Sequence, residues 1–146
     1  SATGKKTRRI LPEKLLEAMG YEVVVVNPLK VKESIEAVRV VFEKYKKGHK
    51  VAIVSRMRCA LEAARISRRR GIILPLYTVL EDKCTGCMAC LKLTACPALT
   101  TEPGSRKPKI MPEICVGCGL CASICPYSAI VVKNNPSENW EDAWWE

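Results

Sequence analysis

The sequence reads Cys84-Thr-Gly-Cys87-Met-Ala-Cys90-Leu-Lys-Leu-Thr-Ala-Cys96-Pro97 and then Cys115-Val-Gly-Cys118-Gly-Leu-Cys121-Ala-Ser-Ile-Cys125-Pro126. The two stretches are copies of one pattern, and they contain eight of the nine cysteines of the chain. Each copy has three cysteines separated by two residues, and a cysteine–proline pair follows. An internal repeat of this kind predicts two equivalent metal-binding segments rather than a disulfide network.

Cysteine repeats with this spacing are typical of ferredoxins with two iron–sulfur clusters, in which each fourth cysteine ligates the other cluster. We therefore expect one [4Fe–4S] cluster on Cys84, Cys87, Cys90 and Cys125. We expect the second on Cys115, Cys118, Cys121 and Cys96. Each cluster has four cysteines available, so both cubes are expected to be complete.

Two other uses of the cysteines explain less of the pattern. Zinc takes four ligands in two pairs, which leaves the third cysteine of each triplet and the cysteine–proline pairs unexplained. A disulfide framework is disfavoured because cysteines spaced so closely are poorly placed to bridge one another. No secretory signal opens the sequence either.

Composition limits the remaining classes. The 146 residues suffice for one medium or two small domains, and the formal net charge is +9. Two clusters of about −2 each would lower that charge to roughly +5.

The aromatic-rich basic pattern of RNA-binding modules is missing, so no nucleic acid is expected. Apolar runs are too short for a membrane span, and we expect a cytoplasmic protein. The lack of Gln and the many charged residues suggest a thermophilic source.

The segment before the cysteines is predicted to be α/β. A helix is expected over 12–20, a strand over 21–26, a helix over 31–47 and a strand over 50–55. Four consecutive valines, 23–26, predict a strand buried on both faces, as in a parallel sheet. The second helix repeats apolar residues at helical spacing, at Val31, Ile35, Val38, Phe42 and Tyr45. Two parallel strands alone do not make a stable sheet. This partial sheet is therefore expected to be completed by other chains or by missing sequence.

Three parts follow from these patterns. Residues 1–75 are the partial α/β segment, with an irregular lead-in at 1–9. Residues 76–133 are an α+β, bacterial-type 2[4Fe–4S] ferredoxin domain, with strands expected at 76–80 and 129–133. Residues 134–146 are an acidic tail that contains Trp140, Trp144 and Trp145, and these are expected to dock on this chain or on a partner because exposed aromatic surface favours association.

Residues outside the repeats offer little chemistry. Cys59 follows a parallel strand, where α/β folds place ligands, but it is expected to be a small buried hydrophobe. His49 lies in a lysine-rich turn and is expected to be solvated. No Ser-His-Asp set, P-loop or dinucleotide-binding glycine motif is present, so no catalytic residue is assigned.

The order of these features resembles the C-terminal part of the large (alpha) subunit of indolepyruvate:ferredoxin oxidoreductase, in the 2-oxoacid:ferredoxin oxidoreductase family. Four segments carry the resemblance: Thr3-Gly4-Lys5-Lys6, the strand and turn from Gly20 to Pro28, the segment from Val51 to Leu61 with its Cys59-Ala60-Leu61, and the ferredoxin repeats with their longer Cys90-x5-Cys96 spacing. That spacing departs from the three residues of simple bacterial ferredoxins.

The resemblance implies a relay. Such enzymes oxidatively decarboxylate an aryl 2-oxoacid such as indolepyruvate with coenzyme A at thiamine diphosphate and magnesium, and clusters pass single electrons to an external ferredoxin. The thiamine motif of the family would precede residue 1, so this chain is expected not to ligate thiamine. It would work with other subunits or segments of the oxidoreductase. Two alternatives remain: a stand-alone 2[4Fe–4S] electron carrier, and a non-redox interaction module stapled by metal.

Overall fold

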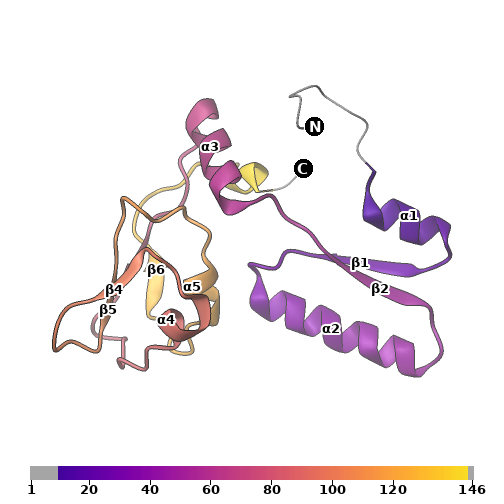
Figure 1. Ribbon diagram of the computed structural model, residues 1–146, viewed down its shortest axis with the longest axis horizontal. Coiled ribbons are helices and arrows are strands. Elements are labelled where there is room, and N and C mark those ends of the chain that lie inside the picture. The colour runs from indigo at the N-terminus through magenta and orange to yellow at the C-terminus, as the bar shows by residue number, and fades with distance from the viewer. Residues whose placement is uncertain (1–9, 145–146) are drawn as a thin grey trace. The chain divides into compact units, whose positions relative to one another are not determined.

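The computed structural model describes residues 10–144. The lead-in at 1–9, the Thr3–Lys6 stretch and Trp145 lie outside the described residues. The chain divides into two compact units (Figure 1). The first extends to Pro28 and resumes over Lys32–Arg56, and the second comprises Leu29–Val31 and the chain from Met57 onward.

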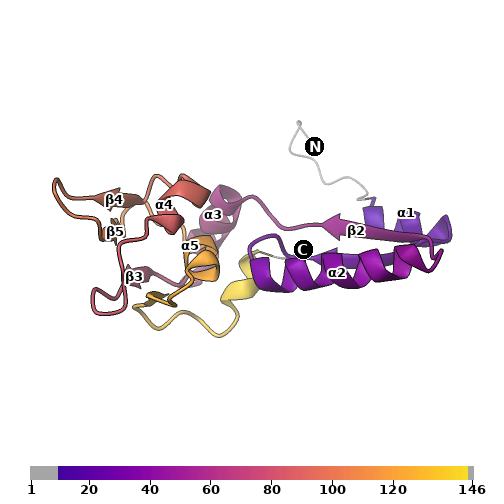
Figure 2. The ribbon, with the colours of Figure 1, turned by 90° about the horizontal axis from the view of Figure 1, so that it is seen from below.

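The first unit is a β-α-β segment preceded by a short helix. Its elements are α1 (Pro12–Ala18), β1 (Glu22–Val26), α2 (Val31–Lys46) and β2 (Val51–Ser55). The two strands are parallel and pair from Glu22 with Val51 to Val26 with Ser55. These elements confirm the helices and strands predicted for this segment. Figure 2 shows α2 running alongside the strands.

Burial in this unit differs from the prediction. The strand β1 was expected to be buried on both faces, but Val25 is 38% exposed and the other three valines are only half-buried. The sheet has two strands within the described residues, so much of its surface has no neighbour. Parallel strands are usually covered on both faces, so within the described residues the valine run lacks the burial that was expected of it.

The helix α2 presents a different stripe to the sheet than its apolar repeat suggests. Ser34 Oγ donates to the carbonyl oxygen of Asn27 at 2.9 Å, and Lys44 Nζ lies 2.7 Å from Glu22 Oε2. Val41, on the same stripe, is the buried residue of the helix. The repeated residues Ile35, Val38, Phe42 and Tyr45 are 49–65% exposed. The helix thus has a second apolar stripe that the described residues leave uncovered.

The second unit contains the cysteine repeats. Its elements are α3 (Ala60–Arg70), β3 (Tyr77–Val79), α4 (Ala89–Thr94), β4 (Leu99–Thr101), β5 (Pro108–Ile110), α5 (Leu120–Ile124), β6 (Ile130–Val132) and the 3-10 helix η1 (Trp140–Ala143). The strands β3 and β6 form one antiparallel pair, and β4 and β5 form another. The pairing of β3 with β6 confirms the strands expected at 76–80 and 129–133. The cysteine repeats thus lie among two antiparallel strand pairs and the short helices α4 and α5.

The helix α3 belongs by packing to the second unit. Ala63 on α3 is fully buried against Ala143 and Trp144 of the tail, and Figure 1 shows α3 beside η1. The compact units consequently divide after Arg56 rather than at residue 75. Trp144 is 2% exposed and Trp140 packs against the same core, which confirms the expected docking of these two tryptophans on this chain. No helix within residues 10–144 has the length and apolar character needed to cross a membrane.

Candidate iron–sulfur centres

The first set of cysteines surrounds one cavity of the second unit. Cys84, Cys87 and Cys90 of the first repeat and Cys125 of the second all line it. The remaining lining is mostly apolar and includes Val79, Met88, Pro108 and Ile130. The fold therefore brings the fourth cysteine of one repeat to the first three of the other. That is the exchange on which the predicted ligand set depends.

The second set is brought together in the same crossed manner. Burial raises the pKa of the Cys118 thiol, and the nearby charges of Cys96 and Cys115 raise it further. Burial raises the pKa of Cys121 to about 12, again with charges from Cys118, Cys115 and Cys96. Electrostatic coupling of this kind requires short separations. Cys96, from the first repeat, thus lies near the triplet of the second.

Coupling in the first set follows the same rule. Burial raises the pKa of Cys90, and the charges of Cys125, Cys84 and Cys87 contribute in the same direction. Each buried thiol is coupled to members of its own expected set. The structure thus sorts the eight cysteines into the two predicted groups of four, while ligation of clusters by them stays a prediction.

The backbone of the two repeats has the same bends. Gly86 and Gly117 hold positive φ angles of 70° and 72°, and Met88 and Gly119 hold φ angles of 61° and 72°. A short helix follows each bend, α4 in the first repeat and α5 in the second. Such bends can gather successive backbone N–H groups into a concave surface. Outside these bends, the backbone N–H of Ala129 donates to Cys125 Sγ, with the N and Sγ atoms 3.4 Å apart.

Glycine at position 117 is required by packing as well as by φ. A β-carbon there would lie 2.5 Å from the carbonyl oxygen of Pro75, which is backbone and cannot move aside cheaply. The segment that leads into β3 therefore lies directly against the second cysteine loop. Pro75 is itself fully buried at this contact.

The donor sets consist of the ligand type that iron–sulfur clusters take. Within residues 10–144, no group of three or more His, Cys, Asp or Glu side chains converges closely enough to hold one metal ion. In a [4Fe–4S] cluster each thiolate binds the cube at a different corner, so its four ligands need not meet at one point. All eight donors are sulfur, which is the ligand type that such clusters take. The residues present are therefore compatible with two cubes.

Cys59 is not where the sequence suggested. It was expected to be a small buried hydrophobe, but it is exposed. It occupies the N-cap position of α3 with an extended backbone, φ −52° and ψ 134°, just outside the helix. The next residue, Ala60, is partly buried against the core of Ala63, Ala143 and Trp144. Cys59 is not among the residues that line the cavity of the first cysteine set.

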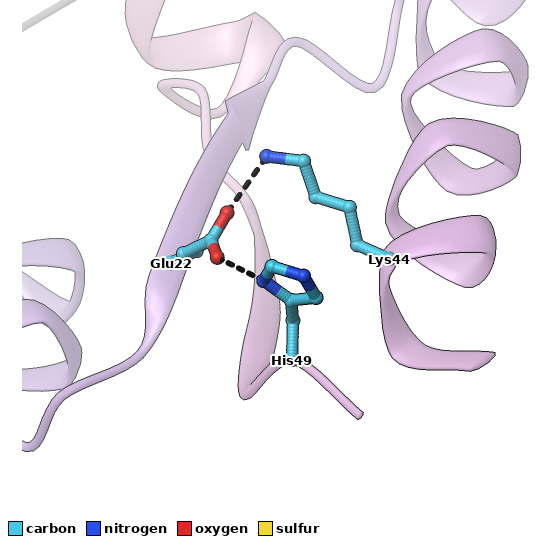
Figure 3. Close-up of polar contacts among 3 residues, drawn as sticks. All are labelled: Glu22, Lys44 and His49. Carbon is cyan, nitrogen blue, oxygen red and sulfur yellow. Dashed lines mark hydrogen bonds and ion pairs between the residues drawn. The ribbon is translucent and has the colours of Figure 1, made fainter. Parts of the chain in front are cut away.

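His49 is exposed as predicted, but it has a partner. Its Nδ1 lies 2.7 Å from Glu22 Oε1, while Lys44 Nζ lies 2.7 Å from Glu22 Oε2 (Figure 3). The three side chains tie the end of α2 and the turn after it to the start of β1. The hydrogen bond from Lys44 and then that from His49 hold the pKa of Glu22 below its ordinary value. The arrangement is a surface clasp, and nothing about it resembles a catalytic set.

Sequence reasoning missed the residues that surround the second set. Tyr77 packs beside it, and burial raises the pKa of its hydroxyl, as do the charges of Cys121, Cys118 and Cys115. Cys118 also packs against the core of Ala63, Ala143 and Trp144. The tryptophans of the tail indicated that the tail packs on another part of the protein. The sequence did not indicate that Cys118 is part of that contact.

Comparison with known proteins supports a 4Fe–4S domain in this chain. A family model described as "4Fe-4S binding domain" matches residues 108–131. The indolepyruvate oxidoreductase subunit IorA of Thermococcus kodakarensis is 42% identical over 123 residues, which are 84% of this chain and 18% of that protein. The same subunit of Archaeoglobus fulgidus is 36% identical over 87% of this chain and 19% of that protein. The chain therefore spans about a fifth of the length of these relatives.

A shorter relative matches a smaller part of the chain. A protein described as "Ferredoxin 7Fe", from Hydrogenibacillus schlegelii, is 30% identical over 63 residues. Those residues are 43% of this chain and 81% of that ferredoxin. A little under half of this chain thus matches about four fifths of a ferredoxin. The thermophilic source suggested by composition fits the archaeal relatives.

Proposed function

Because this chain belongs to the ferredoxin family and is homologous over most of its length to part of indolepyruvate oxidoreductase subunit IorA, we propose that it is the electron-relay portion of a 2-oxoacid:ferredoxin oxidoreductase. The substrate of the complete enzyme is an aryl 2-oxoacid such as indolepyruvate, and coenzyme A is the second substrate. An external ferredoxin receives the electrons. The observation that carries the proposal is the crossed grouping of eight cysteines in a chain with these relatives.

In this proposal two groups of four thiolates hold the cofactors. Cys84, Cys87, Cys90 and Cys125 ligate one [4Fe–4S] cluster, and Cys96, Cys115, Cys118 and Cys121 ligate the other. A [4Fe–4S] cluster accepts and releases one electron at a time. The chain's own contribution is to position the thiolates, to aim backbone N–H groups at sulfur and to limit the access of water, which together set the reduction potential.

The first unit supports the idea that other segments complete the enzyme. Its two-stranded sheet has open edges, and the outer stripe of α2 is exposed. Leu15 of α1 and Met19, which directly follows that helix, are also 57% and 60% exposed. Surface of this kind on one small unit is typical of an interface. Other segments of the oxidoreductase would add strands and cover α2, and they would carry thiamine diphosphate, magnesium and both substrates.

The proposal includes a cytoplasmic location. Clustered cysteines that bind metal rather than pair as disulfides belong to reducing compartments. The nine cysteines are all free in the structure, which is compatible with that assignment.

The test is to purify the native complex through this chain without air. We expect about eight iron and eight sulfide per chain, from two complete cubes. We also expect thiamine diphosphate and further polypeptides to copurify, and an aryl 2-oxoacid with coenzyme A to reduce the clusters. A sample stripped of thiamine is the matched control, and it should hold oxidised clusters that only a chemical reductant reduces.

Two results would overturn the proposal. If the chain emerges alone with clusters but without thiamine or partners, a stand-alone electron carrier is the better account. The match to most of a small ferredoxin is the observation that favours this second candidate. If iron and sulfide are missing and the chain folds around another metal, the redox reading fails and a metal-stapled interaction module remains.

A further inference from the structure

The two cysteine sets have unequal surroundings. Four residues that line the first cavity are exposed: Thr85, Cys87, Pro126 and Tyr127. The exposed fraction of Tyr127 is 50%. All four cysteines of the second set are half-buried, and none is exposed. Cys90 of the first set is buried, but Cys87 is more exposed than any cysteine of the second set.

The tail accounts for part of this difference. Cys118 packs against the core formed by Ala63, Ala143 and Trp144, together with Leu74 and Trp140. The Trp144 side chain is 2% exposed although it lies in the last turn of the described chain. Terminal residues are ordinarily frayed unless something holds them. An aromatic side chain buried here covers the side of the second set that faces α3.

A series of hydrogen bonds holds the tail in place. Asn134 receives a bond from the N–H of Leu76 at 2.7 Å and donates to the carbonyl of Leu74 at 2.9 Å. Ser137 makes a similar pair of bonds with Ile73. The N–H of Ser137 donates to the carbonyl of Ile73, and the N–H of Ile73 donates to Ser137 Oγ, both at 2.9 Å. These bonds follow the segment that also contacts Gly117 and Gly119.

The end of the tail is fixed separately. Arg58 donates from Nη1 to the carbonyl of Ala143 at 2.6 Å, and its backbone N–H donates to the carbonyl of Trp144 at 3.0 Å. The C-terminal carbonyls of η1 are thus paired rather than left to water. Hydrogen bonds therefore hold the tail at Asn134 and Ser137 and again at Ala143 and Trp144. Trp140 and Trp144 belong to the core against which Cys118 packs.

We infer that the tail from Asn134 to Trp144 is a cap that shields the second cysteine set from water and from outside reactants, while the first set stays open at Cys87. The inference rests on the proposed function only in that both sets hold clusters. An outside acceptor can approach Cys87 directly, whereas at Cys118 it meets the tail. Adding an electron to a dry site is costly, so the cap also lowers the potential of the second cluster relative to an uncapped one.

The first experiment uses the intact chain with its clusters. Ferricyanide is added under anaerobic conditions, and the loss of each cluster is followed by electron paramagnetic resonance. Signals are assigned to their sets with Cys87→Ser and Cys115→Ser. We expect the first cluster to be lost before the second. Equal loss of both clusters, or earlier loss of the second, would overturn the inference.

The second experiment opens the cap. In Trp144→Ala, and in the milder Trp140→Ala, the second cluster should be lost as readily as the first, and its potential in a redox titration should rise. The first cluster should keep its potential. Leu61→Ala is the matched control. Leu61 lies on α3 but is 72% exposed, so its replacement should change neither cluster. An unchanged second cluster in a folded Trp140→Ala chain would overturn the inference.

These outcomes are separate from those for the proposed function. Neither experiment uses an aryl 2-oxoacid, thiamine or a partner subunit. A chain that purifies alone would remove the oxidoreductase assignment and leave the cap testable. Conversely, two equally reactive clusters in a thiamine-dependent complex would remove the cap and leave the enzyme assignment. Absence of iron and sulfide would overturn both.

Discussion

The hydroxyl oxygen of Tyr77 lies 2.6 Å from the position that a β-carbon on Gly119 would occupy. Gly119 also has a φ of 72° and immediately precedes α5. Gly119→Ala therefore meets two penalties, a left-handed backbone that costs about 1–2 kcal/mol and a contact with the phenol. We expect the free energy of unfolding to fall by about 2–3 kcal/mol, measured by denaturant titration of the cluster-loaded chain.

The double variant separates the two penalties. Tyr77→Phe removes the hydroxyl oxygen, although the ring carbon that bore it stays 3.2 Å from the new methyl group. Adding Tyr77→Phe to Gly119→Ala should restore part of the lost stability and leave the backbone penalty. If the double variant is no more stable than Gly119→Ala alone, the hydroxyl of Tyr77 does not contribute to the penalty. The tyrosine side chain would then move away from the new methyl group at little cost.

Glu13 and Arg56 form the buried ion pair of the first unit. Arg56 Nη2 lies 3.0 Å from Glu13 Oε1, with the two side chains 23% and 9% exposed. Removing one partner of a buried pair leaves the other charge poorly compensated. We expect Glu13→Ala to lower the free energy of unfolding by about 3 kcal/mol, followed by circular dichroism of the helices. The control is Glu17→Ala, which removes an exposed pair with Lys14 on the same helix and should have no measurable effect.

The sequence alone predicted the elements whose signal is local. The repeats identified the eight cysteines and their crossed grouping, and alternating helix and strand patterns located α1, β1, α2 and β2. The short helices α4 and α5 were not predicted, because six and five residues are too few to form a helix by propensity. They exist because the cysteine loops and their positive φ angles hold them.

Burial was less predictable than secondary structure. The helix α2 has apolar residues on two stripes, and periodicity does not say which one meets the sheet. The contacts of Ser34 and Lys44 with the ends of β1 select the stripe of Val41, and these are tertiary contacts. Cys59 was misjudged for a similar reason, since exposure at a helix N-cap depends on what the helix packs against. The sequence pattern of one helix does not show which other elements that helix packs against.

The Glu22 carboxylate makes stability depend on pH. The hydrogen bond from Lys44, and then that from His49, hold its pKa below the ordinary value of 4.5. A carboxyl group with a lowered pKa in the folded state adds stability above its unfolded pKa, and this stability is lost as the pH falls through the folded value. Glu22→Gln should therefore be less stable than the wild type at neutral pH, and the gap should close in acid.

Salt and a matched variant check the origin of that gap. Glu22 is about half exposed, so added salt should shrink the gap at neutral pH. Glu43→Gln makes the same chemical change at a pair with Lys46 on α2 but leaves the clasp of Figure 3 intact. If Glu43→Gln reproduces the whole pH profile of Glu22→Gln, the clasp is not its source.

Cys59 and Cys87 are both exposed, yet they should react differently. Cys87 is expected to be a cluster ligand, and a thiolate held by iron is not free to attack an alkylating agent. Cys59 lies at the exposed start of α3 and outside both sets. Iodoacetamide added to the cluster-loaded chain should therefore modify about one cysteine, at Cys59, as found by mass spectrometry of peptides. After the clusters are removed with a chelator and an oxidant and the thiols are reduced again, Cys87 should be modified as readily as Cys59.

Cys59→Ser is the control and should leave the loaded chain unlabelled. Early labelling of Cys87 in the loaded chain would contradict its assignment as a ligand, because exposure alone would then decide reactivity.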